Sequence, residues 1–171
     1  MTLNGVHRLQ QCIEGYLDIE TTGLSPYGSE ITVVGIYRCN GELAQFIQLV
    51  GEDISARSIT QALNGVEVLY TYNGSRFDLP FIRSRLGVNL AEEFEHHDLM
   101  YDCWKCNLYG GFKAVERQLG IKRKRTEIDG LEAIRLWWEY INNQNKKALA
   151  ILLEYNKEDV INLKVLRDRL P

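Results

Sequence analysis

The most informative segment of this 171-residue chain is Tyr16-Leu17-Asp18-Ile19-Glu20-Thr21-Thr22-Gly23-Leu24. Its first five residues are mostly apolar and lie between Gly15 and a Thr-Thr-Gly turn, which indicates a strand. Because side chains alternate along a strand, Asp18 and Glu20 share one face. Two carboxylates on such a face are costly unless a cation neutralises them, and Mg²⁺ prefers carboxylate oxygens. The pair alone also fits a strand with one solvated face.

The segments around this strand indicate an α/β fold. Apolar and β-branched runs predict strands at 16–20, 31–37, 43–50, 66–72 and 94–99, of which the first three form an antiparallel meander. Helices are predicted at 54–64 and 79–86. The second half is predicted to be helical, with apolar faces at Phe112, Val115 and Leu119 (ended by Gly120), at Leu131, Ile134, Trp137, Trp138 and Ile141, and over 148–170 with an interruption near Asn156. This order predicts a mixed five-stranded sheet flanked by helices.

A second acidic motif follows the strand at 66–72. Asn73 begins the sequence Asn-Gly-Ser-Arg-Phe-Asp, which ends at Asp78 and opens the next helix. Asp78 therefore lies near the carboxyl end of a strand, where open α/β sheets place their sites. The alternative is that Asp78 only caps the helix, which has Pro80 in its first turn.

A third motif lies in the last helical stretch. Tyr155 and Asp159 are four residues apart, so one helical turn places both on the same face. The apolar residues around them indicate a helix that packs against the sheet. The alternative is that Asp159 is solvated, as we expect for Glu154 and Glu158.

In this order, the three motifs resemble those of the DEDD superfamily of 3′–5′ exonucleases. The motifs are D-x-E at Asp18, N-x-x-x-F-D ending at Asp78, and Y-x-x-x-D ending at Asp159. The third motif resembles the tyrosine branch, because the histidine branch needs His at position 154, which is Glu154. The Asp-Ile-Glu-Thr-Thr-Gly-Leu start, the Asp129-Gly130 pair and the Leu136-Trp137 stretch are similar to the YprB-like, ribonuclease-H-like group of predicted exonucleases.

The resemblance implies a ribonuclease-H-like fold and a two-metal hydrolysis of phosphodiester bonds. Asp18, Glu20 and Asp159 would hold one Mg²⁺ or Mn²⁺, and Asp18 and Asp78 the second. Two such ions, roughly 4 Å apart, clamp the attacking and leaving oxygens of an in-line displacement. The phenol of Tyr155 would orient the attacking water. The substrate would be single-stranded DNA or RNA, cut to 5′-mononucleotides, and its contacts would include Thr21, Thr22, Gly23, Leu24 and Asn73.

The composition is that of one globular domain over residues 1–171. The chain is 45% hydrophobic with a formal net charge of −3, which excludes a disordered or fibrous protein. It has no apolar run of the roughly 20 residues that span a membrane. Since residues 1–11 also lack the apolar stretch of a signal peptide, we expect a cytoplasmic protein. The sequence does not identify a protein partner.

Charge is unevenly distributed along the chain. The segment 112–125 holds six Lys and Arg residues against Glu116 alone, whereas the rest of the chain is acidic. Four of the six are consecutive: Lys122, Arg123, Lys124 and Arg125. Such a run is either a solvated face or a phosphate-binding surface, because phosphate contacts supply most sequence-independent affinity for nucleic acids.

Other residues allow more than one interpretation. Cys103 and Cys106 form half of a zinc site that His96 and His97 would have to complete, and the alternative is reduced thiols near a helix. Asp98 is either a further metal ligand or, as we favour, a residue that caps or positions backbone.

Three functions fit these observations. The first is the 3′–5′ exonuclease, the second is an endonuclease on the same fold, and the third is a non-catalytic nucleic-acid-binding domain. The intact carboxylate set favours an enzyme over the third.

Trp137 and Trp138 are candidates for stacking on nucleic-acid bases, but their helical spacing favours a core or half-buried position.

Overall fold

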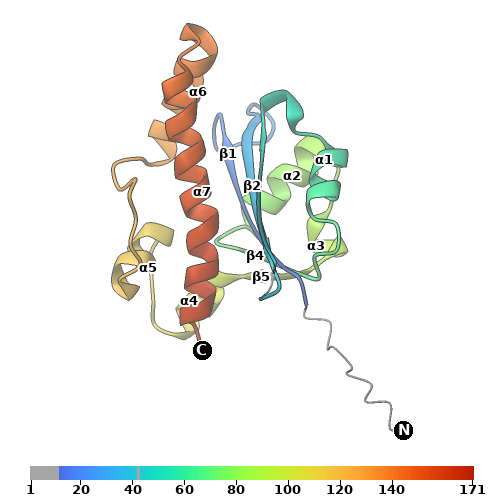
Figure 1. Ribbon diagram of the computed structural model, residues 1–171, viewed down its shortest axis with the longest axis vertical. Coiled ribbons are helices and arrows are strands. Elements are labelled where there is room, and N and C mark those ends of the chain that lie inside the picture. The colour runs from blue at the N-terminus through green and yellow to red at the C-terminus, as the bar shows by residue number, and fades with distance from the viewer. Residues whose placement is uncertain (1–11, 42) are drawn as a thin grey trace, which may run out of the picture.

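The computed structural model of the protein describes residues 12–41 and 43–171, which form a five-stranded sheet and the helices around it (Figure 1). The sheet has the order β3-β2-β1-β4-β5. Its strands are β1 (Glu14–Thr21), β2 (Ile31–Cys39), β3 (Ala44–Val50), β4 (Val68–Thr71) and β5 (Glu95–Asp98). The pairs β1–β2 and β2–β3 are antiparallel, whereas β1–β4 and β4–β5 are parallel. The predicted meander and mixed sheet are confirmed.

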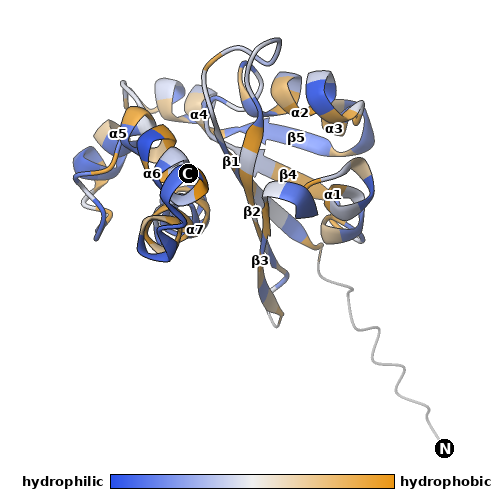
Figure 2. Cartoon of the chain, turned by 90° about the horizontal axis from the view of Figure 1, so that it is seen from above, coloured by the Kyte–Doolittle hydropathy of each residue, from blue (hydrophilic) through white to orange (hydrophobic). Residues whose placement is uncertain are grey.

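Helices cover both faces of the sheet. They are α1 (Ala56–Ala62), α2 (Asp78–Leu86), α3 (Leu90–Glu93), α4 (Leu99–Lys105), α5 (Phe112–Leu119), α6 (Gly130–Asn143) and α7 (Lys146–Arg169). Helices α1 to α3 lie on one side, and α5 to α7 lie on the other (Figures 1 and 2). The sequence does not predict α3, whose four residues make about one turn, or α4, which begins at Leu99, the last residue of the strand predicted at 94–99. In the described ranges, no helix is long and apolar enough to cross a membrane.

The two faces of β1 carry different chemistry. Leu17 and Ile19 belong to the apolar cluster that includes Ile59 of α1 and Ile82 of α2. Tyr16 belongs to the cluster on the other side of the sheet, with Leu163 of α7. Because side chains alternate along the strand, Asp18 and Glu20 share the α7 face with Tyr16. The predicted alternation of β1 is therefore confirmed.

Helix α7 runs without interruption from Lys146 to Arg169, so the predicted break near Asn156 is wrong. Asn156 is fully buried and faces the sheet. Its Nδ2 donates hydrogen bonds to the Asp18 carbonyl (3.3 Å) and to Asp18 Oδ2 (3.0 Å). Its Oδ1 accepts a hydrogen bond from Gln48 Nε2 at 3.0 Å. A tertiary contact, not a helix end, explains this polar residue in an apolar stretch.

Close packing of α7 on β2 depends on Gly35. A Cβ at this position would lie 2.3 Å from Asn156 Oδ1 and 2.7 Å from Val160 Cγ2. We therefore expect Gly35→Ala to lower the free energy of unfolding by about 1–3 kcal/mol, the usual cost of overpacking a core. Urea denaturation followed by circular dichroism measures this. The matched control is Gly28→Ala, whose Cβ would meet nothing within 4 Å. Equal denaturation midpoints for the two variants would contradict the packing argument.

Helix α6 places its two tryptophans differently. Trp137 is buried in a cluster with Leu152 and Tyr155 of α7. Trp138 is 45% exposed. The predicted core position is confirmed for Trp137, whereas Trp138, with Leu131 and Ile141 of the same predicted apolar face, is exposed.

Candidate active site

Three carboxylates from two distant parts of the chain converge between β1 and α7. Asp18, Glu20 and Asp159 each offer an oxygen, and these oxygens all lie within 4.8 Å of one another. Glu20 and Asp159 are buried, and Asp18 is half-buried. The alternating face of β1 supplies the first two, and α7 supplies the third because it packs across that face.

Asp78 lies beside this group but is tied to the backbone of β1. It is the first residue of α2 and is 4% exposed. Its Oδ1 accepts a hydrogen bond from the N–H of Ile19 at 3.1 Å. The N-cap residue of α2 is Phe77, so the carboxylate of Asp78 does not serve as the N-cap. Asp78 is outside the group of three oxygens that lie within 4.8 Å, but it lines the same cavity.

Burial and crowding make this carboxylate set costly. Burial raises the pKa of Asp18 and of Glu20 well above their usual range, and the neighbouring carboxylates raise both further. Burial also raises the pKa of Asp78 to about 7 and that of Asp159 to about 6. Glu20 Oε1 is buried with no hydrogen-bond donor in the described part of the chain. An all-oxygen donor set with an unpartnered buried oxygen fits a hard divalent cation.

Arg123 is the positive charge nearest to this set. Its side chain is 5% exposed and forms ion pairs with Asp159 and, at 2.8 Å, with Glu116 Oε1. The Asn162 amide completes the arrangement by donating to Glu116 Oε1 at 2.7 Å. Arg123 therefore offsets part of the negative charge of the site from the side of α5.

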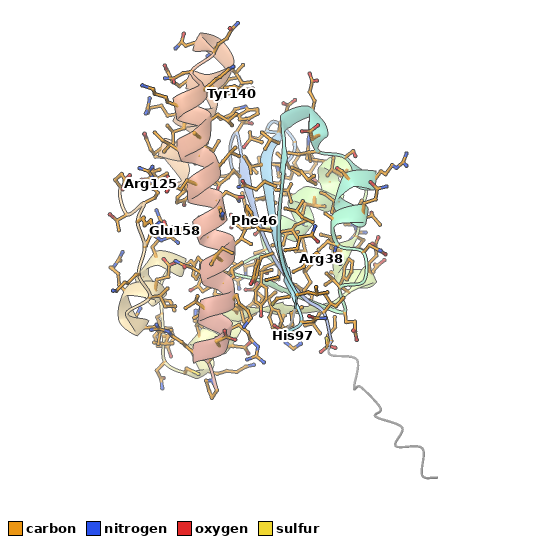
Figure 3. The ribbon with its side chains drawn as sticks, in the orientation of Figure 1. Arg38, Phe46, His97, Arg125, Tyr140 and Glu158 are labelled. Atoms are coloured by element: carbon orange, nitrogen blue, oxygen red, sulfur yellow. The ribbon has the colours of Figure 1, made fainter. Side chains whose placement is uncertain are left out.

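The run Lys122–Arg125 does not form one continuous free basic surface. Arg125 pairs with Glu154, and its backbone N–H donates to Glu158 Oε2 at 2.9 Å. Figure 3 shows Arg125 and Glu158 near one another beside α7. The side chains of Lys122 and Lys124 are exposed. Half of the run is thus engaged in ion pairs with acidic side chains, a tertiary arrangement that sequence patterns do not indicate.

Tyr155 lies one helical turn before Asp159 and is 8% exposed. Its ring packs in the cluster that contains Trp137 and Leu152. Burial, with the nearby Asp159 carboxylate, raises the pKa of Tyr155, so the phenol stays protonated at neutral pH. Its hydroxyl group is then a neutral donor and acceptor at the edge of the carboxylate group.

A cavity of about 570 Å³ opens above the carboxylates. Its lining includes Asp18, Glu20, Thr21, Leu24, Asn73, Asp78, Leu131, Ile134, Tyr155 and Asp159. Leu24 is 86% exposed and Leu131 is 78% exposed, so apolar side chains stand at the cavity in contact with solvent. Thr22 and Gly23 are outside this lining, but they shape the turn that follows β1. The carbonyl oxygen of Gly23 accepts a hydrogen bond from Thr21 Oγ1 at 2.7 Å. Thr22 Oγ1 accepts one from the N–H of Glu30 at 2.9 Å.

Family-model comparison matches residues 15–171 to the RNase H superfamily. The chain belongs to this superfamily. It is 28% identical over 163 residues to the Bacillus subtilis (strain 168) protein whose given name is "Uncharacterized protein YprB". That alignment covers 86% of this chain and 39% of YprB, so the chain spans about two fifths of that relative's length.

Solved structures share the RNase H-like fold. The family B DNA polymerase of the archaeon Pyrobaculum calidifontis superposes with a TM-score of 0.69 at 16% identity, covering 92% of this chain and 24% of the polymerase. Brucella melitensis NrnC bound to pGG superposes with a TM-score of 0.62 at 22% identity, covering 91% of this chain and 70% of NrnC. The ribonuclease-H-like fold predicted from the sequence is confirmed.

Within this RNase H superfamily member, Asp98 positions a loop of the cavity. Its carboxylate accepts hydrogen bonds from Asn73 N–H at 2.7 Å and from Ser75 N–H at 3.0 Å, and it caps α4 through Met100 N–H. Asn73 adopts a left-handed backbone with φ of 62°, which these contacts hold in place. Asp98 thus has the capping and positioning contacts that its place at a strand end favours.

The cysteine and histidine residues form no metal-type cluster in residues 12–41 and 43–171, where the one group of this kind is the acidic one. His96 Nε2 lies 2.9 Å from Thr71 Oγ1, and His97 pairs with Glu95 at 2.9 Å. Cys103 is a buried free thiol, and Cys106 is a free thiol nearby in sequence. The structure favours the reduced-thiol interpretation over a zinc site.

Sequence reasoning missed Asn156 and Lys113 as residues of this site. Asn156 holds Asp18 in place, and Lys113 approaches the ring of Tyr155. The Asn next to Tyr155 in an apolar helix face was the one available signal for the first. For Lys113 no local pattern exists, because its place depends on how α5 docks against α7.

Proposed function

We propose that this chain is a metal-dependent 3′–5′ exonuclease of the tyrosine branch of the DEDD superfamily. Its substrate is single-stranded DNA or RNA, which it hydrolyses to 5′-mononucleotides. The observation that carries the proposal is the convergence of Asp18, Glu20 and Asp159 beside Tyr155, with Glu20 Oε1 buried and unpartnered. The relatedness to structures of a DNA polymerase and of NrnC bound to pGG supports a nucleic-acid substrate.

The acidic residues divide between two ion positions in this proposal. Asp18, Glu20 and Asp159 would hold one Mg²⁺ or Mn²⁺, and Asp18 and Asp78 would hold the second. When bound, such ions would lower the pKa of a water and stabilise the negative charge on the departing 3′ oxygen. The hydrogen bond from Ile19 N–H to Asp78 fixes the fourth carboxylate, and Asn156 fixes Asp18.

The remaining residues bind and orient the substrate. Thr21 and Leu24 face the terminal nucleotide from the turn that Thr22 and Gly23 shape, with Leu24 against its base. Asn73 positions the strand from the loop that Asp98 holds. In the basic run, Lys122 and Lys124 supply phosphate contacts, whereas Arg123 and Arg125 act mainly through their ion pairs.

Product analysis tests this function. Single-stranded DNA and RNA of the same sequence, labelled at the 5′ end, are incubated with Mg²⁺ or Mn²⁺. We expect a labelled ladder that shortens from the 3′ end, together with unlabelled 5′-mononucleotides, which chromatography with ultraviolet detection measures. Cleavage of circular single strands would instead favour the endonuclease. Binding of either polymer without any hydrolysis would favour the non-catalytic domain.

Tyr155→Phe tests the role of the phenol. The ring packing is kept and the hydroxyl is removed, so we expect kcat to fall about 10²-fold, as for loss of a group that orients or transfers a proton. KM changes little, because the ring still lines the cavity. Steady-state kinetics measures both constants.

The matched control is Tyr140→Phe, which removes a hydroxyl from a ring that packs on Trp137 but does not line the cavity. We expect its kcat to equal that of the unmodified protein. An unchanged kcat in Tyr155→Phe would assign Tyr155 to the core alone.

A further inference from the structure

Lys113 is a buried amine without a polar partner. It lies in the first turn of α5, and its Nζ is inaccessible to solvent. Among the described residues, no hydrogen-bond partner reaches this Nζ. The amine instead lies 4.8 Å from the centre of the Tyr155 ring. Arg123 approaches the same ring at 5.8 Å, but its charge is already paired with Glu116 and Asp159.

An ammonium group in this position is incompletely satisfied. It has three N–H donors and needs acceptor oxygens, and the face of an aromatic ring provides no such oxygen. A cation over a tyrosine ring recovers only part of the cost of burying a charge. An unpartnered ammonium group beside a cavity fits an anionic ligand whose oxygens accept hydrogen bonds from it.

Lys113 lines a second hollow that adjoins the main cavity. This hollow has a volume of about 340 Å³ and is bordered by Gly111, Phe112, Lys113 and Ala114 on the α5 side. It shares Asp18, Tyr155 and Asp159 with the main cavity. A chain that places one nucleotide over the carboxylates therefore extends into the neighbourhood of Lys113. Because the carboxylates repel phosphate groups, a cation on this side favours binding of the polyanion.

We propose that Lys113 is a substrate-binding residue whose side chain turns from the Tyr155 ring into the adjoining hollow and donates a hydrogen bond to a phosphate oxygen of the nucleic acid chain there. This rests on the proposed function, since it names a contact to the substrate of that site. The alternative is that Lys113 only offsets the negative charge of the neighbouring carboxylates of Asp159, Asp129 and Glu116.

The first experiment is steady-state kinetics of Lys113→Met and Lys113→Arg. Met keeps most of the aliphatic stem and removes the charge, so we expect KM to rise about tenfold, the loss of one hydrogen bond to a charged group. Arg keeps the charge and should hold KM within about threefold of the unmodified protein. The matched control is Arg117→Gln on the same helix, which removes an exposed charge and should leave KM unchanged.

The second experiment separates this proposal from the function itself. A 5′-fluorescein-labelled single-stranded DNA oligonucleotide is titrated in the Asp18→Asn background, where turnover is blocked, at several salt concentrations. Adding Lys113→Met should raise Kd. It should also reduce the slope of log Kd against log salt by about 0.7, which corresponds to the loss of one phosphate contact.

Four outcomes are informative. An unchanged KM and an unchanged salt slope in Lys113→Met, with normal hydrolysis by the unmodified protein, overturn the Lys113 contact and leave the function standing. A reduced slope with no hydrolysis by the unmodified protein supports the contact and overturns the exonuclease. A lower melting temperature with unchanged KM and slope also overturns the contact, in favour of charge compensation. Recovery of KM in Lys113→Arg supports the contact even if Lys113→Met is less stable.

Discussion

Asp18→Asn is expected to reduce hydrolysis by at least about 10³-fold, because bound metal supplies several kcal/mol of transition-state stabilisation and each 1.36 kcal/mol is a factor of ten. Asp18 is the carboxylate shared by both proposed ion positions, so its loss affects both. Asn keeps the size of the side chain, and its amide oxygen still accepts the hydrogen bond from Asn156 Nδ2. The fold should therefore survive. Single-turnover rates at saturating Mg²⁺ measure the effect, and circular dichroism checks the fold.

Asp18 is a better test of the metal positions than Asp159. Asp159→Asn also breaks the ion pair with Arg123, whose side chain would be left buried with one partner fewer. The matched control is Asp168→Asn near the end of α7, where the carboxylate is 59% exposed and pairs with Lys164. We expect the control to retain full activity. A folded Asp18→Asn protein with more than a tenth of the normal rate would refute the assignment of Asp18 as a shared ligand.

The sequence predicts those parts of the fold that local chemistry determines. The alternation of Leu17 and Ile19 with Asp18 and Glu20 predicts that one face of β1 is apolar and the other carries the carboxylates, because the period of a strand is two. That single register determines that Glu20 and Asp159 meet. The single domain and the roles of the site residues stay predictions.

Other features depend on contacts between distant segments and have no local signal. Asn156 looks like a helix break, but it bridges α7 to Asp18 and Gln48 across more than 100 residues. Arg123 belongs to a charged run typical of a solvated face, but its side chain is buried and forms ion pairs with Glu116 and Asp159. The sequence predicts neither contact, because a polar residue's role is set by the partner that the tertiary fold brings to it.

The basic run illustrates how charge patterns mislead at a site of this kind. Formal charge in the segment 112–125 is strongly positive, but Glu116 and Glu158 pair with Arg123, and Glu154 pairs with Arg125. In the part of the chain that the structure describes, Lys122 and Lys124 are exposed, and Lys113 Nζ at the cavity has no hydrogen-bond partner, so these three cations contact the phosphate chain in the proposed function. Affinity for nucleic acid in the proposed function then depends on a few placed cations rather than on net charge.

Mg²⁺ or Mn²⁺ is expected to raise the melting temperature by roughly 5–10 °C at 100 times Kd. A ligand that binds only the native state adds about 2.7 kcal/mol at that concentration, which corresponds to this shift for a domain of this size. The metal-free site opposes folding, because burial and mutual repulsion raise the pKa of Asp18, Glu20 and Asp78. A cation removes this repulsion. Differential scanning fluorimetry in EDTA and in each metal measures the shift, which EDTA should reverse.

Asp18→Asn distinguishes a specific site from a general effect of ions on an acidic surface. Removing one of the crowded carboxylates relieves repulsion, so the metal-free melting temperature should rise slightly. The same change removes a ligand, so the response to metal should shrink. Asp168→Asn, on the exposed end of α7, should leave both values unchanged. A screening effect of surface charge would survive Asp18→Asn, so an equal metal response in the two variants would mean that the carboxylates do not form one ion site. The same conclusion would follow if neither metal, up to millimolar concentrations, changed the melting temperature of the unmodified protein.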